Sequence, residues 1–110
     1  MKFNSKTAEV YIPNGLPVEQ ALSRTTHLCV AAHQDDIEIM AAQPILACFH
    51  QADKAFTGVV VTDGRGSPRD GLYKDYTDEA MRLIRFSEQR KAADVGEYAA
   101  QVLLDYPSKV

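Results

Sequence analysis

Three side chains that can do metal or acid–base chemistry stand close together in the sequence: His33, Asp35 and Asp36. They follow the short apolar run 28–32, which has the length and composition of a strand buried on both faces of a parallel sheet. In open α/β sheets, ligands bind outside the carboxyl ends of the strands. The pattern therefore predicts an active-site edge where this strand ends.

The spacing of these residues predicts a chemical role for each of them. If the chain turns from strand to helix after His33, side chains three positions apart converge, so His33 and Asp36 could hold one metal ion. An imidazole and a carboxylate suit zinc, which lowers the pKa of a bound water to about 7 when one position stays open. Asp35 would be the free base beside that water. A purely structural interpretation also fits, because acidic residues before a helix serve as N-caps and interact favourably with its dipole.

The sequence around these residues resembles a known family. The segment Ala32–Asp36, Ala-His-Gln-Asp-Asp, is similar to the Ala-His-Pro-Asp-Asp signature of the PIG-L/LmbE family of metal-dependent N-acetylglucosamine deacetylases, with Gln34 in the usual proline position. Residues 59–64 resemble the second strand of that family and its Thr-Asp-Gly ending. Residues 85–88 resemble its Arg-x-x-Glu helix, so three matches occur in family order.

The resemblance implies a role for each residue of the signature. His33 and Asp36 would be ligands of zinc or another divalent metal, and Asp35 would be the general base. In the family, a histidine downstream of the matched region supplies the third metal ligand. The resemblance therefore implies that this ligand, and a histidine that protonates the leaving amine, lie beyond Val110.

The remaining pattern predicts a Rossmann-like three-layer α/β sandwich with a mainly parallel sheet, of which this chain would supply the amino-terminal portion. Strands are predicted over residues 9–12, 27–32, 55–61 and 99–106, the last being ambiguous with a helix. Helices are predicted over residues 17–23, 44–50 and 77–96, with Pro44 restarting a helix after a loosely helical lead-in. Right-handed βαβ connections would place Asp63 on the same sheet edge as His33. An open sheet edge and an apolar helix face would need cover from further chain or another subunit.

The long helix predicted over residues 77–96 carries a charged pair. Helical spacing puts four apolar residues on one stripe: Met81, Ile84, Ala92 and Val95. Glu88 falls on the same stripe, and a carboxylate there needs a partner, for which Arg85 is well spaced. This pair is interpreted as an intrahelical ion pair, and a direct catalytic role is the less favoured alternative.

The segment 63–76 contains three glycines and a proline without periodicity, which predicts a long loop over the site. It lacks the dinucleotide-binding fingerprint, because Arg69 follows Gly64-x-Gly66 where a glycine would be needed. Arg65 and Arg69 could hold sugar hydroxyls or a substrate phosphate, although loop arginines are often only solvated. The family places a substrate-contacting arginine in this region, and either residue could correspond to it.

Composition limits the classes of function. The 110 residues allow one domain, here 1–110 as a single, incomplete PIG-L/LmbE-like unit, and a net charge of −3 offers no basic surface for nucleic acid. No run approaches the roughly 18 apolar residues of a membrane span, so a cytoplasmic location is expected. Cys29 and Cys48 are expected to be buried reduced thiols, and His27 and His50 to be structural.

Together these features predict a zinc-dependent hydrolase that removes the acetyl group from an N-acetylglucosamine-type substrate. Its partners would be that N-acetylated amino sugar and, as one option, a second copy of the chain in a homo-oligomer. Two alternatives stay open. A non-catalytic sugar-binding or assembly module would keep the fold with an incomplete metal site. A phosphate-handling hydrolase would usually prefer magnesium and oxygen ligands, whereas His33 favours zinc.

Overall fold

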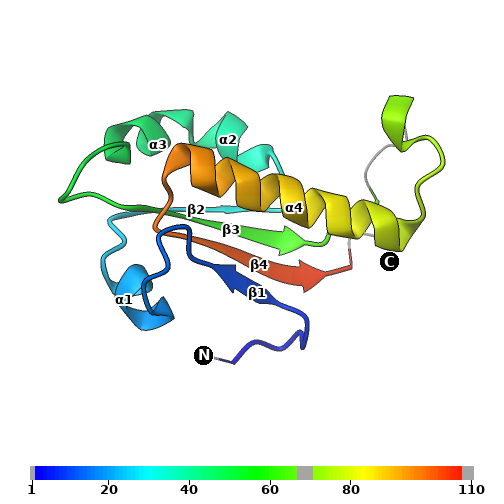
Figure 1. Cartoon of the computed structure of the whole chain (residues 1–110), viewed down its shortest axis with the longest axis horizontal. Coiled ribbons are helices and arrows are strands. Elements are labelled where there is room, and N and C mark those ends of the chain that lie inside the picture. Colours follow the sequence, from blue (N-terminus) through cyan, green and yellow to red (C-terminus); the bar gives the residue numbers. More distant parts are fainter. Residues whose placement is uncertain (1, 67–70, 108–110) are drawn as a thin grey trace.

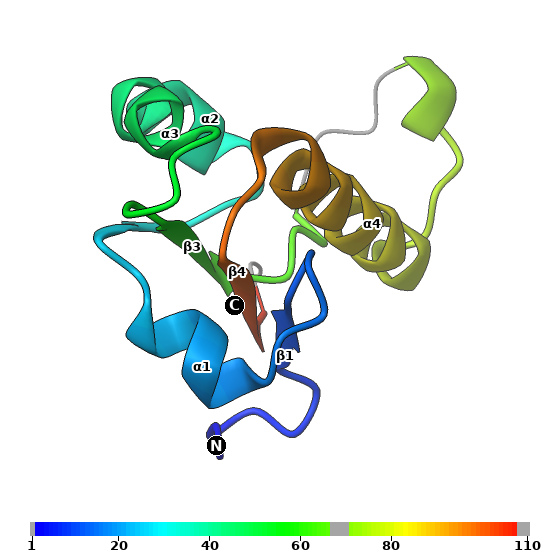
Figure 2. The same ribbon diagram turned by 60° about the vertical axis from the view of Figure 1, so that its left-hand side comes forward.

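A four-stranded sheet with helices on both faces forms the body of the protein, as a computed structural model of residues 2–66 and 71–107 shows (Figure 1). In chain order the elements are β1 (Glu9–Tyr11), α1 (Val18–Ser23), β2 (His27–Ala31), α2 (Asp36–Met40), α3 (Ala42–Cys48), β3 (Phe56–Thr62), the 3₁₀ turn η1 (Gly71–Tyr73), α4 (Asp78–Gly96) and β4 (Ala100–Tyr106). Helices α2, α3 and α4 cover one face and α1 lies on the other (Figure 2). The predicted Rossmann-like α/β fold is confirmed.

The strand order is β1-β4-β3-β2, and the three strands β2, β3 and β4 run parallel. β1 pairs antiparallel with β4 at one edge of the sheet, as expected for a short edge strand. Residues 100–106 are a strand, so the ambiguity between strand and helix at this segment is resolved in favour of the strand. The carboxyl ends of the parallel strands therefore share one edge, which is where the site was expected.

β2 is an outer strand of the sheet, and only one of its faces is buried. Ala31 is buried in the core cluster beside Ile37, whereas Leu28 is 62% and Val30 is 56% exposed. Side chains alternate across a strand, so these two point away from α2. Helix α1 packs against β4 and leaves this part of β2 open. The prediction that both faces of this strand are buried is wrong, because an apolar run alone does not show how many faces are covered.

The segment after β2 folds as two short helices. α2 ends at Met40, Ala41 leaves helical geometry with φ −117° and ψ 26°, and α3 begins at the next residue. Pro44 is the third residue of α3, where its missing N–H would have no helical partner in any case. The predicted restart of the helix is confirmed.

The buried face of α4 differs from the predicted stripe. Met81, Phe86 and Ala93 are buried together with Gln89, which is fully buried, while Val95 is 70% exposed. The buried face of α4 is centred on Gln89. Counting apolar positions alone would place this polar residue on the solvent side. The predicted stripe is therefore wrong in its position around the helix.

A β-bulge near the end of β4 fixes α4 to the sheet. Val60 pairs with Leu103 but Thr62 pairs with Tyr106, so β4 carries one extra residue there. Asp105 in this bulge has φ 63° and is buried. Arg82 of α4 donates from Nε to Asp105 Oδ1 at 2.8 Å and from Nη2 to Oδ2 at 2.7 Å, and the Thr7 hydroxyl donates to the same carboxylate. Such two-point Arg–carboxylate pairs are strong and directional.

No helix within residues 2–66 and 71–107 has the length and apolar character needed to cross a membrane.

The Asp105 pair predicts a specific pH dependence of stability. Burial acts to raise the pKa of Asp105, but the hydrogen bonds from Arg82 and Thr7 outweigh it and hold this pKa below its usual value of 3.8. A carboxyl group with a lowered pKa stabilises the folded state above its usual pKa, and this contribution is lost as the pH falls through the lowered value. Asp105→Asn should reduce the free energy of unfolding at neutral pH by about 3 kcal/mol and weaken its decline in acid.

Urea unfolding at pH 7 and at a pH near 3 measures both effects. Asp53→Asn, at an exposed loop position, is the matched control and should behave as the wild type. An acid decline in Asp105→Asn as steep as that of the wild type would contradict this account.

Candidate metal centre

The ends of β2 and β3 meet at one edge of the sheet, as predicted. The backbone N–H of Thr62 donates to the Ala32 carbonyl at 3.0 Å, and the Thr62 hydroxyl donates to the same oxygen at 2.7 Å. Gln34 Nε2 donates to the Thr62 carbonyl at 3.1 Å. These bonds place the segment Thr62–Gly64 beside residues 33–36, which we call the β2–α2 turn.

His33 and Asp36 converge within the β2–α2 turn. His33 Nδ1 lies 3.5 Å from Asp36 Oδ2, and the backbone N–H of His33 donates to the same oxygen at 3.2 Å. Both side chains reach solvent, and an imidazole nitrogen beside a carboxylate oxygen fits two ligand positions of a zinc ion. Within the described part of the chain, no third His, Cys, Asp or Glu joins them in a group that could hold a metal. Their role as metal ligands stays a prediction.

The Asp35 carboxylate does not cap the helix that it precedes. This residue stands at the N-cap of α2 with φ 72° and ψ −20°, and its side chain makes no capping hydrogen bond. A left-handed backbone costs a non-glycine residue about 1–3 kcal/mol, so the surroundings must hold it. The N-capping interpretation therefore does not account for Asp35, whose side chain is 58% exposed at the site edge.

Arg85 of α4 holds the β2–α2 turn from the side. Its Nη1 donates to Asp35 Oδ2 at 3.1 Å, and its Nη2 donates to the Gln34 carbonyl at 2.9 Å. The same Nη1 donates to Glu88 Oε1 at 3.2 Å, so the predicted ion pair within α4 is present. Tyr73 donates to the other oxygen of Glu88. The sequence did not reveal that the Arg85 guanidinium also reaches Asp35, because that contact depends on how α4 crosses the sheet.

Gln89, four residues after Arg85 on α4, makes the second contact that fixes the β2–α2 turn. Its Oε1 accepts the backbone N–H of Asp35 at 3.1 Å. Its Nε2 donates to Gln101 Oε1 at 3.1 Å and to Glu38 Oε2 at 3.2 Å. The sequence pattern did not single out Gln89, although its spacing of four from Arg85 places both on one face of α4.

Glu38 also accepts a hydrogen bond from the Tyr98 hydroxyl. Burial, followed by this hydrogen bond, raises the pKa of Tyr98 well above its usual value, so Tyr98 stays protonated and donates. The polar groups beneath the β2–α2 turn thus form a connected network between α2, α4 and β4.

Gln34, at the position where the family signature has proline, is packed tightly under the turn. Its side chain is buried, and its Oε1 has no hydrogen-bond partner among the residues that the structure describes. A Cβ at Gly64 would lie 2.6 Å from that oxygen, and Gly64 has φ +78°. The third residue of the Thr-Asp-Gly ending is therefore glycine for both space and backbone conformation.

A comparison with protein families decides the assignment. The family model of PIG-L, described as GlcNAc-PI de-N-acetylase, matches residues 28–109, which include the β2–α2 turn and α4. The chain belongs to the PIG-L family. Membership places it among deacetylase-type hydrolases, and the deacetylases of this family are generally metal-dependent. No curated protein and no solved structure gives a significant match to this chain.

The two arginines predicted to contact substrate are placed differently in this PIG-L chain. Arg65 turns back on Asp63, with Nε donating to Oδ2 at 2.5 Å and the backbone N–H donating to Oδ1 at 3.0 Å. Asp63 is fully buried, and the Arg65 side chain that pairs with it is half-buried. The Arg65 guanidinium is therefore held by the protein and is not simply solvated. Arg69 lies outside the described residues. A contact of either arginine with substrate stays a prediction.

The other histidines and the cysteines lie away from the β2–α2 turn. His27 Nδ1 lies 2.9 Å from the Thr26 hydroxyl and 3.3 Å from Cys48 Sγ at the start of β2. His50 pairs with Glu97 at 3.2 Å beyond the end of α3. Cys29 and Cys48 are both free thiols, but only Cys48 is buried, so the expected burial of Cys29 is wrong. These positions agree with the structural roles expected for both histidines.

The hydrogen bond between Gln89 of α4 and the Asp35 backbone predicts how a substitution of Gln89 would change stability and hydrogen exchange. Replacing it by alanine removes the acceptor of the Asp35 N–H and the donor to Gln101 Oε1. Gln89→Ala should therefore lower the free energy of unfolding by about 2 kcal/mol. Hydrogen exchange at the Asp35 amide should become faster, because that amide loses its acceptor. Ser87→Ala, at an exposed position of the same helix, is the control. Unchanged exchange at Asp35 in Gln89→Ala would show that this hydrogen bond does not hold the turn.

Proposed function

We propose that this PIG-L chain carries part of the active site of a zinc-dependent deacetylase that acts on an N-acetylglucosamine-type substrate. The observation that carries the proposal is the β2–α2 turn. His33 and Asp36 converge to 3.5 Å, while Asp35 between them is turned aside and paired with Arg85. This divides the three residues into two candidate metal ligands and one separate carboxylate.

The donor atoms decide which metal we propose. One imidazole and one carboxylate suit zinc better than magnesium, which prefers a shell of oxygen ligands. A divalent ion held there would polarise the acetamide carbonyl and make water more acidic. The remaining protein ligand would come from outside residues 2–66 and 71–107.

In this proposal Asp35 is the general base. Its exposed carboxylate takes a proton from the water that adds to the acetamide carbonyl, and the C–N bond then breaks to give acetate and a free amine. Arg85 and Gln89 fix the left-handed turn, so they act as positioning residues for Asp35. The proton for the leaving amine would come from a group outside the described residues.

A second candidate is a sugar-binding module of the same fold without catalysis. The observation that favours it is the number of ligands, because the described residues bring only His33 and Asp36 together. Acetate release separates the two candidates, since a binding module would take up the sugar without hydrolysing it.

Asp35→Asn tests the base directly. Asparagine tolerates the left-handed conformation and keeps the size of the side chain, so fold and zinc content should be retained. Acetate release from an N-acetylglucosamine substrate in the presence of zinc should fall by about a hundredfold or more. His33→Ala should lose both zinc and activity, and Asp75→Asn, in an exposed part of the loop, should change neither. Wild-type rates in Asp35→Asn would rule out this residue as the base.

A further inference from the structure

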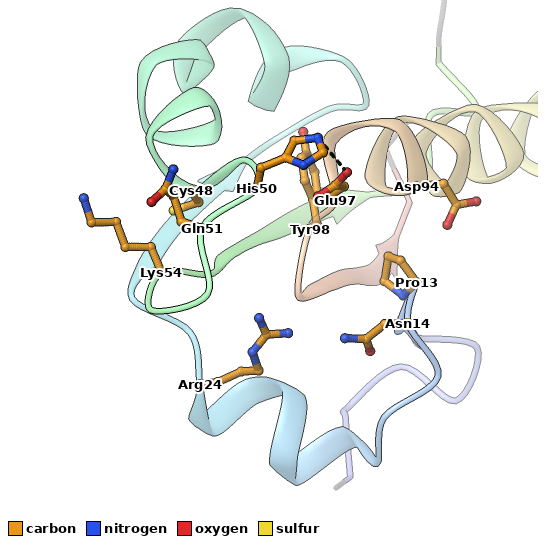
Figure 3. A pocket seen from close by; sticks show the side chains of 10 residues that line it. All are labelled: Pro13, Asn14, Arg24, Cys48, His50, Gln51, Lys54, Asp94, Glu97 and Tyr98. Atoms are coloured by element: carbon orange, nitrogen blue, oxygen red, sulfur yellow. Dashed lines mark ion pairs between the residues drawn. The ribbon is translucent and has the colours of Figure 1, made fainter.

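A second cavity lies at the opposite edge of the sheet from the β2–α2 turn (Figure 3). Its volume is about 360 Å³, which is within the usual range for small-molecule sites. Residues just before the parallel strands line it, with Arg24 ahead of β2, Lys54 ahead of β3 and Glu97 ahead of β4. Since β3 spans seven residues at about 3.3 Å each, roughly 20 Å separate the two edges. The cavity is not part of the candidate metal centre.

The carboxylates of this cavity already have partners within the protein. Both oxygens of Asp94 accept from the Tyr11 hydroxyl, at 2.7 and 2.9 Å. Glu97 Oε2 lies 3.2 Å from His50 Nε2, and Figure 3 draws this pair at the upper wall. Both carboxylates therefore already have polar partners within the protein.

The hydrogen-bond donors of the cavity, in contrast, lack partners within the described part of the protein. The guanidinium of Arg24 and the ammonium of Lys54 make no hydrogen bond or ion pair with any residue that the structure describes. Asn14 uses Oδ1 to accept the backbone N–H of Leu16 at 3.1 Å, which leaves its Nδ2 available. Figure 3 shows Arg24 rising from the end of α1 into the cavity, with Asn14 facing it from the loop after β1.

We propose that this cavity binds the phosphate group of a small phosphomonoester, with Arg24 as the main anchor. A guanidinium offers a planar fork of donors that matches two phosphate oxygens. Asn14 faces the Arg24 guanidinium from the loop after β1, and Lys54 adds positive charge at the outer side of the cavity. Two facing groups of donors with a further cation nearby suit an anion with several oxygen atoms. Asp94 and Glu97 disfavour ligands with several further negative charges, such as polyphosphates. The phosphate could belong to a soluble metabolite or to a lipid headgroup.

Amide and arginine side-chain NMR spectra of the whole chain, titrated with inorganic phosphate and with glycerol 3-phosphate, test the proposal. We expect saturable shifts around residues 14, 24 and 54. Arg24→Gln should weaken binding about tenfold or more, and Lys54→Gln less. Lys91→Gln removes the same charge from an exposed position of α4 outside the cavity and should bind like the wild type.

Sedimentation with phosphatidylcholine vesicles that contain phosphatidic acid distinguishes the two sources. Arg24-dependent binding to these vesicles with no saturation by glycerol 3-phosphate would assign a lipid headgroup, and the reverse would assign a soluble ester. Absence of saturable binding to every probe, or an equal loss in Arg24→Gln and Lys91→Gln, would overturn the proposal. His33→Ala should bind phosphate like the wild type, so failure of the proposed deacetylase does not affect this test.

Discussion

The hydrogen bond from the Asp35 backbone N–H to the buried amide of Gln89 is the constraint on which the site depends. A left-handed aspartate is unfavourable by itself and persists only where its surroundings fix it. Gln89 fixes the backbone from below while Arg85 fixes the carboxylate and the preceding carbonyl from the side. Both side chains come from one face of α4, so the orientation of this helix on the sheet sets the geometry of the β2–α2 turn.

That orientation is itself determined at the two ends of α4. Near its beginning, Arg82 makes a two-point pair with Asp105 in the bulge of β4. Towards its end, the chain returns through Glu97 to Tyr98, whose hydroxyl reaches Glu38 on α2. The helix is thus fixed to the sheet at one end and to α2 at the other, and a polar network rather than apolar contact alone determines how it crosses the strands. Because the fully buried amide of Gln89 needs partners for its oxygen and its nitrogen, this network favours one arrangement over nearby alternatives.

Much of this arrangement could be predicted from local sequence. The strand order along the chain, the helix restart at Pro44 and the meeting of the β2 and β3 ends all follow from short-range patterns and from the handedness of βαβ units. The convergence of His33 and Asp36 follows from their spacing of three. The buried face of α4 could not be predicted by counting apolar residues, because its centre is Gln89. The exposure of Leu28 and Val30 could not be predicted either, because the sequence of an apolar strand does not indicate whether helices cover one or both of its faces. The contact between Arg85 and Asp35 joins residues 50 positions apart and depends on tertiary structure.

The central claim is that His33 and Asp36 bind one metal ion. The most direct test is a zinc titration of the purified chain, beside His33→Ala and Asp36→Ala. We predict saturable binding of one zinc ion by the wild type and loss of this binding in both variants. Equal zinc binding in all three proteins, or none in any of them, would contradict the claim that this pair binds the metal.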